Sequence, residues 1–455
     1  MNAPKPGTAE AARATDDASA RPSLGYAWYV VFALMVCYTL SFIDRQILSL
    51  LVGPIQQDLG ISDTRIGLLQ GLAFAMFYTV LGIPVGRLAD NYSRRNIISL
   101  GVFFWSLMTA LSAGARSFWS LFGARIGVGV GEATLSPSAF SLISDYFPKD
   151  RLAKALSVYS MGIFIGSGLA SIVGGVVVDA VRDIPDVTVP VFGTIASWRL
   201  TFLIVGVPGI LAALLVYTIR EPQRQNVMRG PDGRIARLSL SRVLDEIGLR
   251  WKSVVGLSLA LAFQSSCNYA LLAWGPTYFI RVHGWSASQA GGTLGTIVLT
   301  VGCLGLFTGG WLSDRWQRRG IRESSLKVGY IACIGAAIFA AAAMSAPSVT
   351  MTVVLLVPAL FFLSLPVGTS YASLQIIFPN QLRGQVSAIF LFAITLIGLT
   401  LGPLWPGLLN DYVFRNPNML GYSIAITIGL SGLLTAFLFR ISYGPYKRDH
   451  QMLHG

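Results

Sequence analysis

Long runs of apolar residues, separated by short polar connections, recur along the chain from Tyr26 to Arg440. Each run is about 20 residues or longer, which is enough for an α-helix to cross the hydrocarbon core of a bilayer. Residues 1–23 contain no apolar core, so we expect neither a signal peptide nor a span there, but a disordered cytoplasmic tail. The pattern predicts twelve membrane-spanning helices, over residues 26–52, 64–87, 95–114, 118–146, 152–181, 198–219, 251–280, 288–312, 325–345, 349–377, 382–410 and 419–440.

The two halves of the chain repeat the same polar motifs at equivalent places in the predicted helix order. The second span is followed by Gly86-Arg-Leu-Ala-Asp90-Asn-Tyr-Ser-Arg94-Arg95, and the eighth span is followed by Gly310-Trp-Leu-Ser-Asp314-Arg315-Trp-Gln-Arg318-Arg319. A second echo, Phe147-Pro148 and Phe378-Pro379, lies after the fourth and tenth spans, and its two copies are separated by a similar length of chain. Repeats of this kind are typical of secondary transporters.

The repeat predicts an all-α membrane protein of two six-helix bundles, which resembles the major facilitator superfamily fold. We expect an N-terminal bundle over 24–220 and a C-terminal bundle over 251–440. Residues 221–250 form a basic cytoplasmic linker, in which 238–249 predict an amphipathic helix on the membrane surface. Residues 441–455 form a cytoplasmic tail.

Composition agrees with a membrane protein. Of the 455 residues, 53% are hydrophobic and only 12% are charged, and the mean hydropathy is +0.62. These values exclude disorder for most of the chain, as well as collagen-like and disulfide-rich classes. The four cysteines lie inside apolar runs without metal-binding spacing, and the three histidines lie outside the runs. We therefore expect no metal and no cofactor.

The net charge of +13 has a topological meaning. In a soluble protein such a charge would suggest nucleic acid. If the N-terminus lies inside, 26 of the 34 Lys and Arg residues fall in inner segments and only six in outer ones. The positive-inside rule then places both termini in the cytoplasm, and we expect no nucleic-acid partner.

The loop after the second span predicts a cytoplasmic gate. Asp90 can face a helix N-terminus in the other half, where the helix dipole favours an anion. Arg94 or Arg95 can pair with Asp145 at the end of the fourth span. These contacts would lock the cytoplasmic side while the protein is open to the outside. The alternative is that the arginines only enforce topology, but topology needs no aspartate.

The second copy of the motif is less complete. Asp314 and Arg315 are kept, but no acid ends the tenth span, where Asn380 is the nearest polar residue. Arg383 can still meet Asp314 or a phosphate, so we include all three charged residues in the predicted gate.

Four ionisable residues break the apolar pattern inside the first bundle: Asp44, Arg45, Arg125 and Glu132. A charge at mid-bilayer costs at least about 2.5–3.5 kcal/mol, so such residues are functional candidates. At about 1.5 Å per residue, Asp44 and Arg125 lie at compatible depths, and Arg125 and Glu132 share one helix face. One carboxylate, Asp44 or Glu132, would exchange a proton, and Arg45 and Arg125 would bind an anionic head group. The alternative is a fixed cluster of ion pairs that joins the first and fourth spans.

The second bundle offers polar but uncharged groups for the opposite wall. We name Ser265, Asn268, Tyr269 and Tyr371 as candidate substrate contacts, although a helix–helix hydrogen bond is the simpler explanation of each one taken alone. A cavity charged on one side and neutral on the other suits an amphiphile.

Several first-half motifs together resemble the spinster family: Ser41-Phe-Ile-Asp44-Arg45, Gly67-Leu-Leu-Gln70, Phe104-Trp105-Ser106, Arg125-x-Gly127-Val-Gly129-x-Gly131-Glu132-Ala133, Ser141-x-Ile-x-Asp145-Tyr-Phe147 and Arg220-Glu221-Pro222. The resemblance covers residues 26–440 and is densest in the first half. It implies transport of lysophospholipids and sphingosine-1-phosphate-like lipids, as in animal members, and it matches the four membrane charges to the family's functional charges. The spacing suggests a bacterial homologue and hence the inner membrane.

These observations predict a monomeric, proton-coupled secondary transporter that works by alternating access on an amphiphilic, lipid-like substrate, with protons and membrane lipids as its other partners. The alternative is a proton symporter for a small organic anion. An enzyme would need a nucleophile with a positioned base, a nucleotide-driven pump would need a phosphate-binding loop, and the sequence offers neither. A static scaffold would not need the repeated gate. Substrate identity, direction and stoichiometry stay open.

Overall fold

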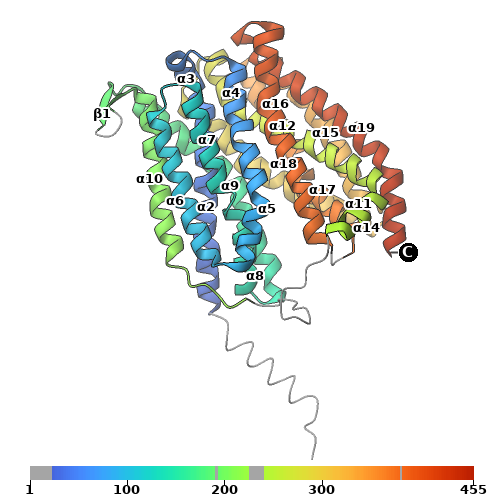
Figure 1. Cartoon of the computed structure of the whole chain (residues 1–455). Coiled ribbons are helices and arrows are strands. Elements are labelled where there is room, and N and C mark those ends of the chain that lie inside the picture. The colour runs from blue at the N-terminus through green and yellow to red at the C-terminus, as the bar shows by residue number, and fades with distance from the viewer. Residues whose placement is uncertain (1–22, 190–192, 225–239, 380–381, 455) are drawn as a thin grey trace, which may run out of the picture.

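The chain folds into a bundle of long, roughly parallel helices (Figure 1). The computed structural model describes residues 23–189, 193–224, 240–379 and 382–454. The first helix begins and the last helix ends at the same end of the bundle (Figure 1). We call this the termini end, and the opposite one the distal end.

The N-terminal half contains ten helices and a small hairpin within the described residues. Its strands β1 and β2 pair antiparallel, with Val187 opposite Ile195. The elements are α2 (Leu24–Leu50), α3 (Val52–Leu59), α4 (Asp63–Gln70), α5 (Leu72–Asn91), α6 (Arg94–Leu111), η1 (Ser112–Gly114), α7 (Phe118–Glu132), α8 (Leu135–Tyr146), α9 (Lys149–Arg182), β1 (Val187–Val189), β2 (Gly193–Ile195) and α10 (Ser197–Tyr217).

The C-terminal half is entirely helical over the residues that the structure describes. It begins with the short helix that the sequence predicted in the linker. The elements are α11 (Leu240–Leu249), α12 (Trp251–His283), α13 (Ala287–Ile297), η2 (Val298–Gly302), α14 (Cys303–Arg318), α15 (Ser324–Met344), α16 (Val349–Ser364), α17 (Pro366–Ile376), α18 (Arg383–Leu408), η3 (Leu409–Phe414), η4 (Pro417–Met419) and α19 (Leu420–His454).

The predicted helical membrane fold is confirmed, since the described residues contain twelve helical segments long and apolar enough to span a bilayer. The segments are not all regular: the second span breaks at Gly71 between α4 and α5, and the eighth contains the π-helical turn η2. The last helix also continues to His454, through residues expected to form a separate tail. Most of the expected N-terminal tail and linker lies outside the described residues.

Serine residues set where several helices begin. Ser62, Ser93, Ser117, Ser286 and Ser348 each accept a hydrogen bond from a backbone N–H in the first turn of the helix that follows. The first backbone amides of a helix have no hydrogen-bond partner within it. A serine directly before the helix accepts from one of them and offsets part of the cost of leaving these amides unpaired. The apolar run decides that a helix forms, and the serine decides its first residue.

Within the described residues, the buried core joins the halves mainly at one end. A large apolar cluster at the distal end contains residues of both halves, among them Leu50, Ile66, Trp274 and Leu294. Towards the termini end the core divides into a first-half cluster, to which Leu399 of α18 contributes, and a second-half cluster around α12, α18 and α19. The halves are therefore packed together distally.

Glycines allow the helices around the predicted site to pack closely. A Cβ at Gly131 in α7 would lie 2.7 Å from the backbone nitrogen of Trp105 in α6, whereas one at Gly123, also in α7, would meet nothing within 4 Å. The contact between α6 and α7 therefore depends on Gly131.

This contact predicts unequal effects of two similar substitutions. Gly131→Ala overpacks the interface, which typically costs about 1–3 kcal/mol, and we expect it to lower the melting temperature of the purified protein by several degrees. Gly123→Ala has free space and gains helix propensity, so the melting temperature should be unchanged or higher. Equal melting temperatures for the two variants would contradict the described packing.

Candidate functional site

The centre of the site is an ion pair between α2 and α7. Arg45 donates to Oε2 of Glu132 through Nε, at 2.6 Å, and through Nη2. The hydroxyl of Ser41, one helical turn before Arg45, donates to the same oxygen. The Glu132 side chain is fully buried, so it has exchanged water for these donors.

Asp44 and Arg125 also meet, but the contact that joins them is to the backbone of Asp44 and is not an ion pair of the side chains. Arg125 Nη1 donates to the backbone carbonyl oxygen of Asp44 at 3.0 Å, and both residues are about 1–2% exposed. The Asp44 carboxyl instead lies beside Thr109 and Trp105 of α6, and its Oδ1 has no hydrogen-bond partner in the described structure. The sequence predicted one network of two acids and two bases; the structure places the four residues together but ion-pairs only Arg45 with Glu132.

Aromatic rings surround the exposed edge of Arg45. Its guanidinium carbon lies 4.4 Å from the ring centroid of Phe74, 5.1 Å from that of Tyr78 and 5.2 Å from that of Phe42. The Arg45 side chain keeps 16% of its surface exposed, whereas the Glu132 side chain keeps none. Arg45 is thus the part of the ion pair that an incoming molecule can touch, and it is already held by ring faces.

Sequence reasoning named Arg45 but missed its aromatic neighbours. Phe74 and Tyr78 lie one turn apart on α5, and their rings stack with centroids 5.1 Å apart. Their spacing in the second span was the available signal. However, the sequence of a membrane helix does not show whether an aromatic ring faces a cavity or the lipid.

The four substrate contacts predicted in the second half lie in different surroundings. Tyr269 of α12 packs against the first-half core together with Tyr38 and Tyr78, so it faces the Arg45 region. Ser265 lies where α12 meets α18: a Cβ at Gly398 would stand 2.4 Å from the Cβ of Ser265. Asn268 donates to the carbonyl of Gln264 in its own helix. The side chain of Tyr371 lies outside the described residues, and the role of all four in binding stays a prediction.

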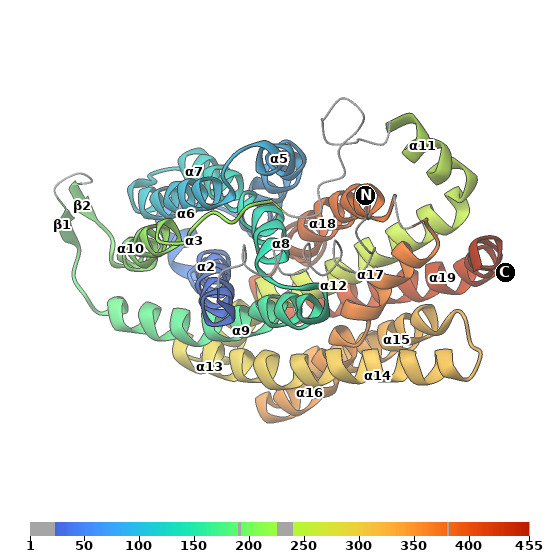
Figure 2. The same cartoon turned by 90° about the horizontal axis from the view of Figure 1, so that it is seen from below.

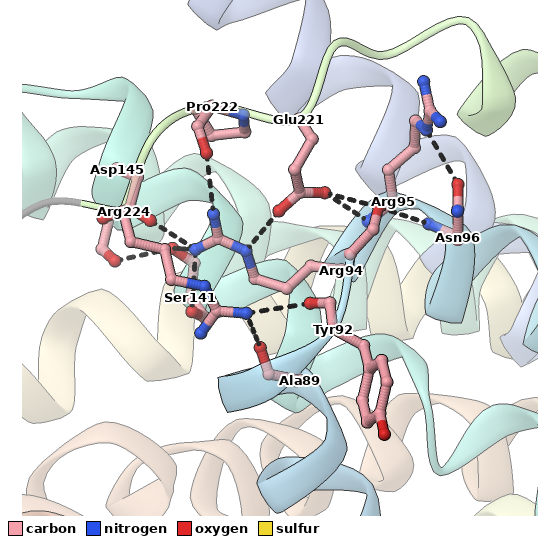
Figure 3. Close-up of polar contacts among 12 residues, drawn as sticks. Ala89, Tyr92, Arg94, Arg95, Asn96, Ser141, Asp145, Glu221, Pro222 and Arg224 are labelled. Atoms are coloured by element: carbon pink, nitrogen blue, oxygen red, sulfur yellow. Dashed lines mark hydrogen bonds and ion pairs between the residues drawn. The ribbon is translucent and has the colours of Figure 1, made fainter. Parts of the chain in front are cut away.

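At the termini end, the gate residues of the first half form a brace inside that half (Figure 3). Arg94 is 1% exposed and pairs with Asp145 of α8, which is one of the two pairings that the sequence allowed. It also pairs through Nε with Glu221, at 2.8 Å. Arg94 therefore ties α6, α8 and the start of the linker together, and these contacts do not cross to the other half.

Glu221 is the residue of this brace that sequence reasoning missed. Its Oε2 accepts from the backbone N–H of Arg95 at 2.9 Å and from the Ser93 hydroxyl at 3.0 Å, so it caps α6 (Figure 3). Burial disfavours the charged form, but the backbone N–H of Arg95, the Arg94 guanidinium and the Ser93 hydroxyl together hold the pKa of Glu221 below its usual value. The only signal in the sequence was its place in Arg220-Glu221-Pro222.

The remaining gate residues make no contact that tests the prediction. Asp314 and Arg315 are exposed at the end of α14, where Arg315 lies over the ring of Trp311. The side chains of Asp90 and Arg383 lie outside the described residues. A gate made by these four residues stays a prediction.

Two six-helix halves that enclose buried charges define the class of polytopic membrane transporters. The chain belongs to the Major Facilitator Superfamily, whose family model matches residues 34–403. It is a transporter of this superfamily, as the sequence predicted.

Solved and curated relatives agree with this assignment. A bacterial homologue of the human lysosomal transporter spinster, solved in an inward-facing and unoccupied conformation, is 29% identical, with a TM-score of 0.75 over 94% of this chain and 98% of that one. An MFS-type efflux pump of Mycolicibacterium smegmatis is 28% identical over 93% of this chain and 94% of the relative. A hexuronate transporter of Bacillus subtilis is 24% identical over 88% and 93%. The predicted similarity to spinster proteins is confirmed.

The Glu221 brace predicts a pH-dependent contribution to stability. Because the pKa of Glu221 is lowered in the folded protein, its contribution is complete above the ordinary glutamate pKa of about 4.3 and is lost as the pH falls through the lowered value. We expect Glu221→Gln to reduce the free energy of unfolding by about 1 kcal/mol at pH 7.

The measurement is the melting temperature of both proteins from pH 7 down to pH 3. The difference between them should shrink at the acidic end. A difference that is constant over the whole range would show that the carboxylate charge does not stabilise the brace.

Proposed function

We propose that the protein is a proton-coupled transporter that moves an amphiphilic anion by alternating access. The substrate class is a lipid-like molecule with an anionic head group, such as a lysophospholipid. The protein works as a monomer in the bacterial inner membrane, with its termini end in the cytoplasm, a placement that the excess of Lys and Arg in the predicted inner segments supports. The distal end then faces outward, and the packed distal core corresponds to an inward-facing conformation.

The observation that carries the proposal is the position of Arg45. Arg45 is paired with a fully buried carboxylate on one side and is partly exposed among Phe42, Phe74 and Tyr78 on the other. An anionic head group binds such an arginine by charge-assisted hydrogen bonds. The apolar part of an amphiphile packs against the rings. Tyr269 from the other half closes the same region.

Proton coupling follows from competition for Arg45. When an anion takes the guanidinium, Glu132 is left buried without its countercharge, which is costly unless the carboxylate accepts a proton. Asp44 is buried and forms no ion pair in the described structure, whereas Glu132 is paired with Arg45, so we assign to Asp44 the proton that is held in this conformation. Arg125 fixes the backbone of α2 at Asp44 and thereby positions both acids. The two carboxyls thus have different roles, which the sequence alone left open.

A small organic anion is the second candidate substrate. Relatives named as hexuronate and D-galactonate transporters support it, since their named substrates are small carboxylates. Arg45 would bind either head group, whereas the aromatic surroundings favour the amphiphile.

Uptake into proteoliposomes with an imposed pH gradient tests the proposal. We expect Glu132→Gln to lower gradient-driven uptake of a lysophospholipid at least tenfold, because the variant cannot exchange a proton at this position, while the protein remains folded. Glu246→Gln is the matched control, since Glu246 lies in the surface helix α11, away from the site, and pairs with Arg250 directly after that helix. Its transport should match the parent protein.

The same liposomes separate the substrate classes. Competition by lysophospholipids, without competition by hexuronate, supports the amphiphile. Competition by hexuronate alone supports the small-anion alternative and removes the lipid proposal. Unchanged gradient-driven transport in Glu132→Gln would overturn the coupling mechanism for either substrate.

A further inference from the structure

Two sets of helices join the halves by direct backbone contact. α9 lies against α13 (Figure 2), and α18 lies against α4 and α5. A Cβ at Gly175 would stand 2.4 Å from the carbonyl oxygen of Ala287, and one at Gly407 would stand 2.5 Å from that of Asp63. No side chain fits there, so these helices approach as closely as glycine permits.

We call the contact of α9 with α13 the first seam and the contact of α18 with α4 and α5 the second seam. At the distal end of the first seam, a carboxylate caps a helix of the other half. Asp179, near the end of α9, accepts hydrogen bonds from the backbone N–H groups of Ala287 at 3.1 Å and Ser288 at 2.8 Å. These are the first two amides of α13. An anion at this place satisfies two donors that lack partners within the helix and lies at the positive end of its dipole.

At the distal end of the second seam, a carboxylate again caps a helix of the opposite half. Asp411, in η3 directly after α18, accepts from the backbone N–H groups of Asp63 at 3.3 Å and Thr64 at 2.7 Å. These are the first two amides of α4. Here the carboxylate comes from the second half and the capped helix from the first, so the two seams are reciprocal.

The match is a consequence of the internal repeat. The length of chain from Asp179 to Asp411 is nearly the same as that from Asp63 to Ala287, and both are close to the separation of the repeated loop motifs. In both helices the N-cap serine, Ser62 or Ser286, binds the next free amide. Each helix therefore begins with one cap from its own half and one carboxylate from the other.

A recess beside the second seam gives its carboxylate access to water. A cavity of about 500 Å³ is lined by Gln56, Asp63, Arg281 and Asp411, among others. Arg281 binds both carboxylate oxygens of Asp63, at 2.8 and 2.9 Å, and adds an ion pair between the halves. When Asp411 leaves α4, it can therefore be hydrated.

We propose that Asp179 and Asp411 are two reciprocal clasps that hold the distal end closed, and that both must release before the site opens to that side. The inference rests on alternating access in the proposed function and adds the contacts that oppose opening. Because each carboxylate caps a helix of the opposite half, separating the halves leaves that helix end without two of its hydrogen-bond acceptors.

The alkylation rate of one engineered cysteine tests the clasps. Thr277 lines the distal cavity, is 3% exposed and donates to the carbonyl of Ser49 across the interface between the halves. With Thr277→Cys as the only cysteine, a maleimide reacts at a rate proportional to the open population. We expect Asp179→Ala and Asp411→Ala each to raise this rate roughly tenfold. The double variant should raise it roughly a hundredfold, because the two carboxylates contribute independently to the free energy of opening.

Two controls separate release of the clasps from general loosening. Asp58 lies at the same end but binds Trp198 and Arg199 within its own half, so Asp58→Ala should leave the rate unchanged. Cys37 is fully buried in the first-half core, and as the only cysteine it should stay unreactive in every variant. An unchanged rate in the double variant, or an equal rise in Asp58→Ala, would overturn the proposal. The readout needs no substrate, so failure of the proposed transport activity would not affect it.

Discussion

A charge inside a membrane must be compensated, and in this protein the compensation is the buried pair of Arg45 and Glu132. The pair joins α2 to α7, and Ser41 supplies a further donor to the same carboxylate oxygen. If one partner is engaged elsewhere, the other becomes an uncompensated charge, which costs several kcal/mol. In the mechanism that we propose, an anion that binds Arg45 changes the protonation that Glu132 requires. The aromatic rings around Arg45 and the backbone contact of Arg125 would hold the pair in place for this exchange.

In the proposed alternating access, the rest of the bundle would let this site face one side at a time. The halves are joined distally by a shared apolar core and by glycine-lined seams, whereas the clusters towards the termini end largely belong to one half each. The Arg94 brace keeps the first half rigid at its termini end without tying it to the second. Because backbone-to-backbone contacts bury little side-chain surface, they can separate without leaving large apolar cavities. Two such seams related by the internal repeat allow the halves to move as rigid bodies.

Much of this organisation could be predicted from the sequence. Apolar periodicity predicted the twelve spans, and the repeat predicted the two bundles, because both are set by the length and order of apolar runs. Topology predicted that Asp145 pairs with Arg94 or Arg95, but the choice of Arg94 came only from the structure. Helix geometry placed Arg125 and Glu132 on one face, but it could not decide that Arg125 binds the backbone of Asp44 while Arg45 takes Glu132, since that depends on side-chain rotamers. Glu221 and Asp411 were missed because a carboxylate near a loop looks the same whether it is solvated or caps a distant helix.

We propose that a substrate anion displaces Glu132 from Arg45 and that Glu132 then takes up a proton. Proton uptake on ligand binding tests this most directly, with purified protein in weakly buffered detergent solution at pH 7 and a pH-indicator dye. Binding of a lysophospholipid with an anionic head group should remove about one proton from solution per ligand bound, and the Glu132→Gln variant should bind the ligand without proton uptake. Saturable binding to the unaltered protein with no proton uptake would contradict the account.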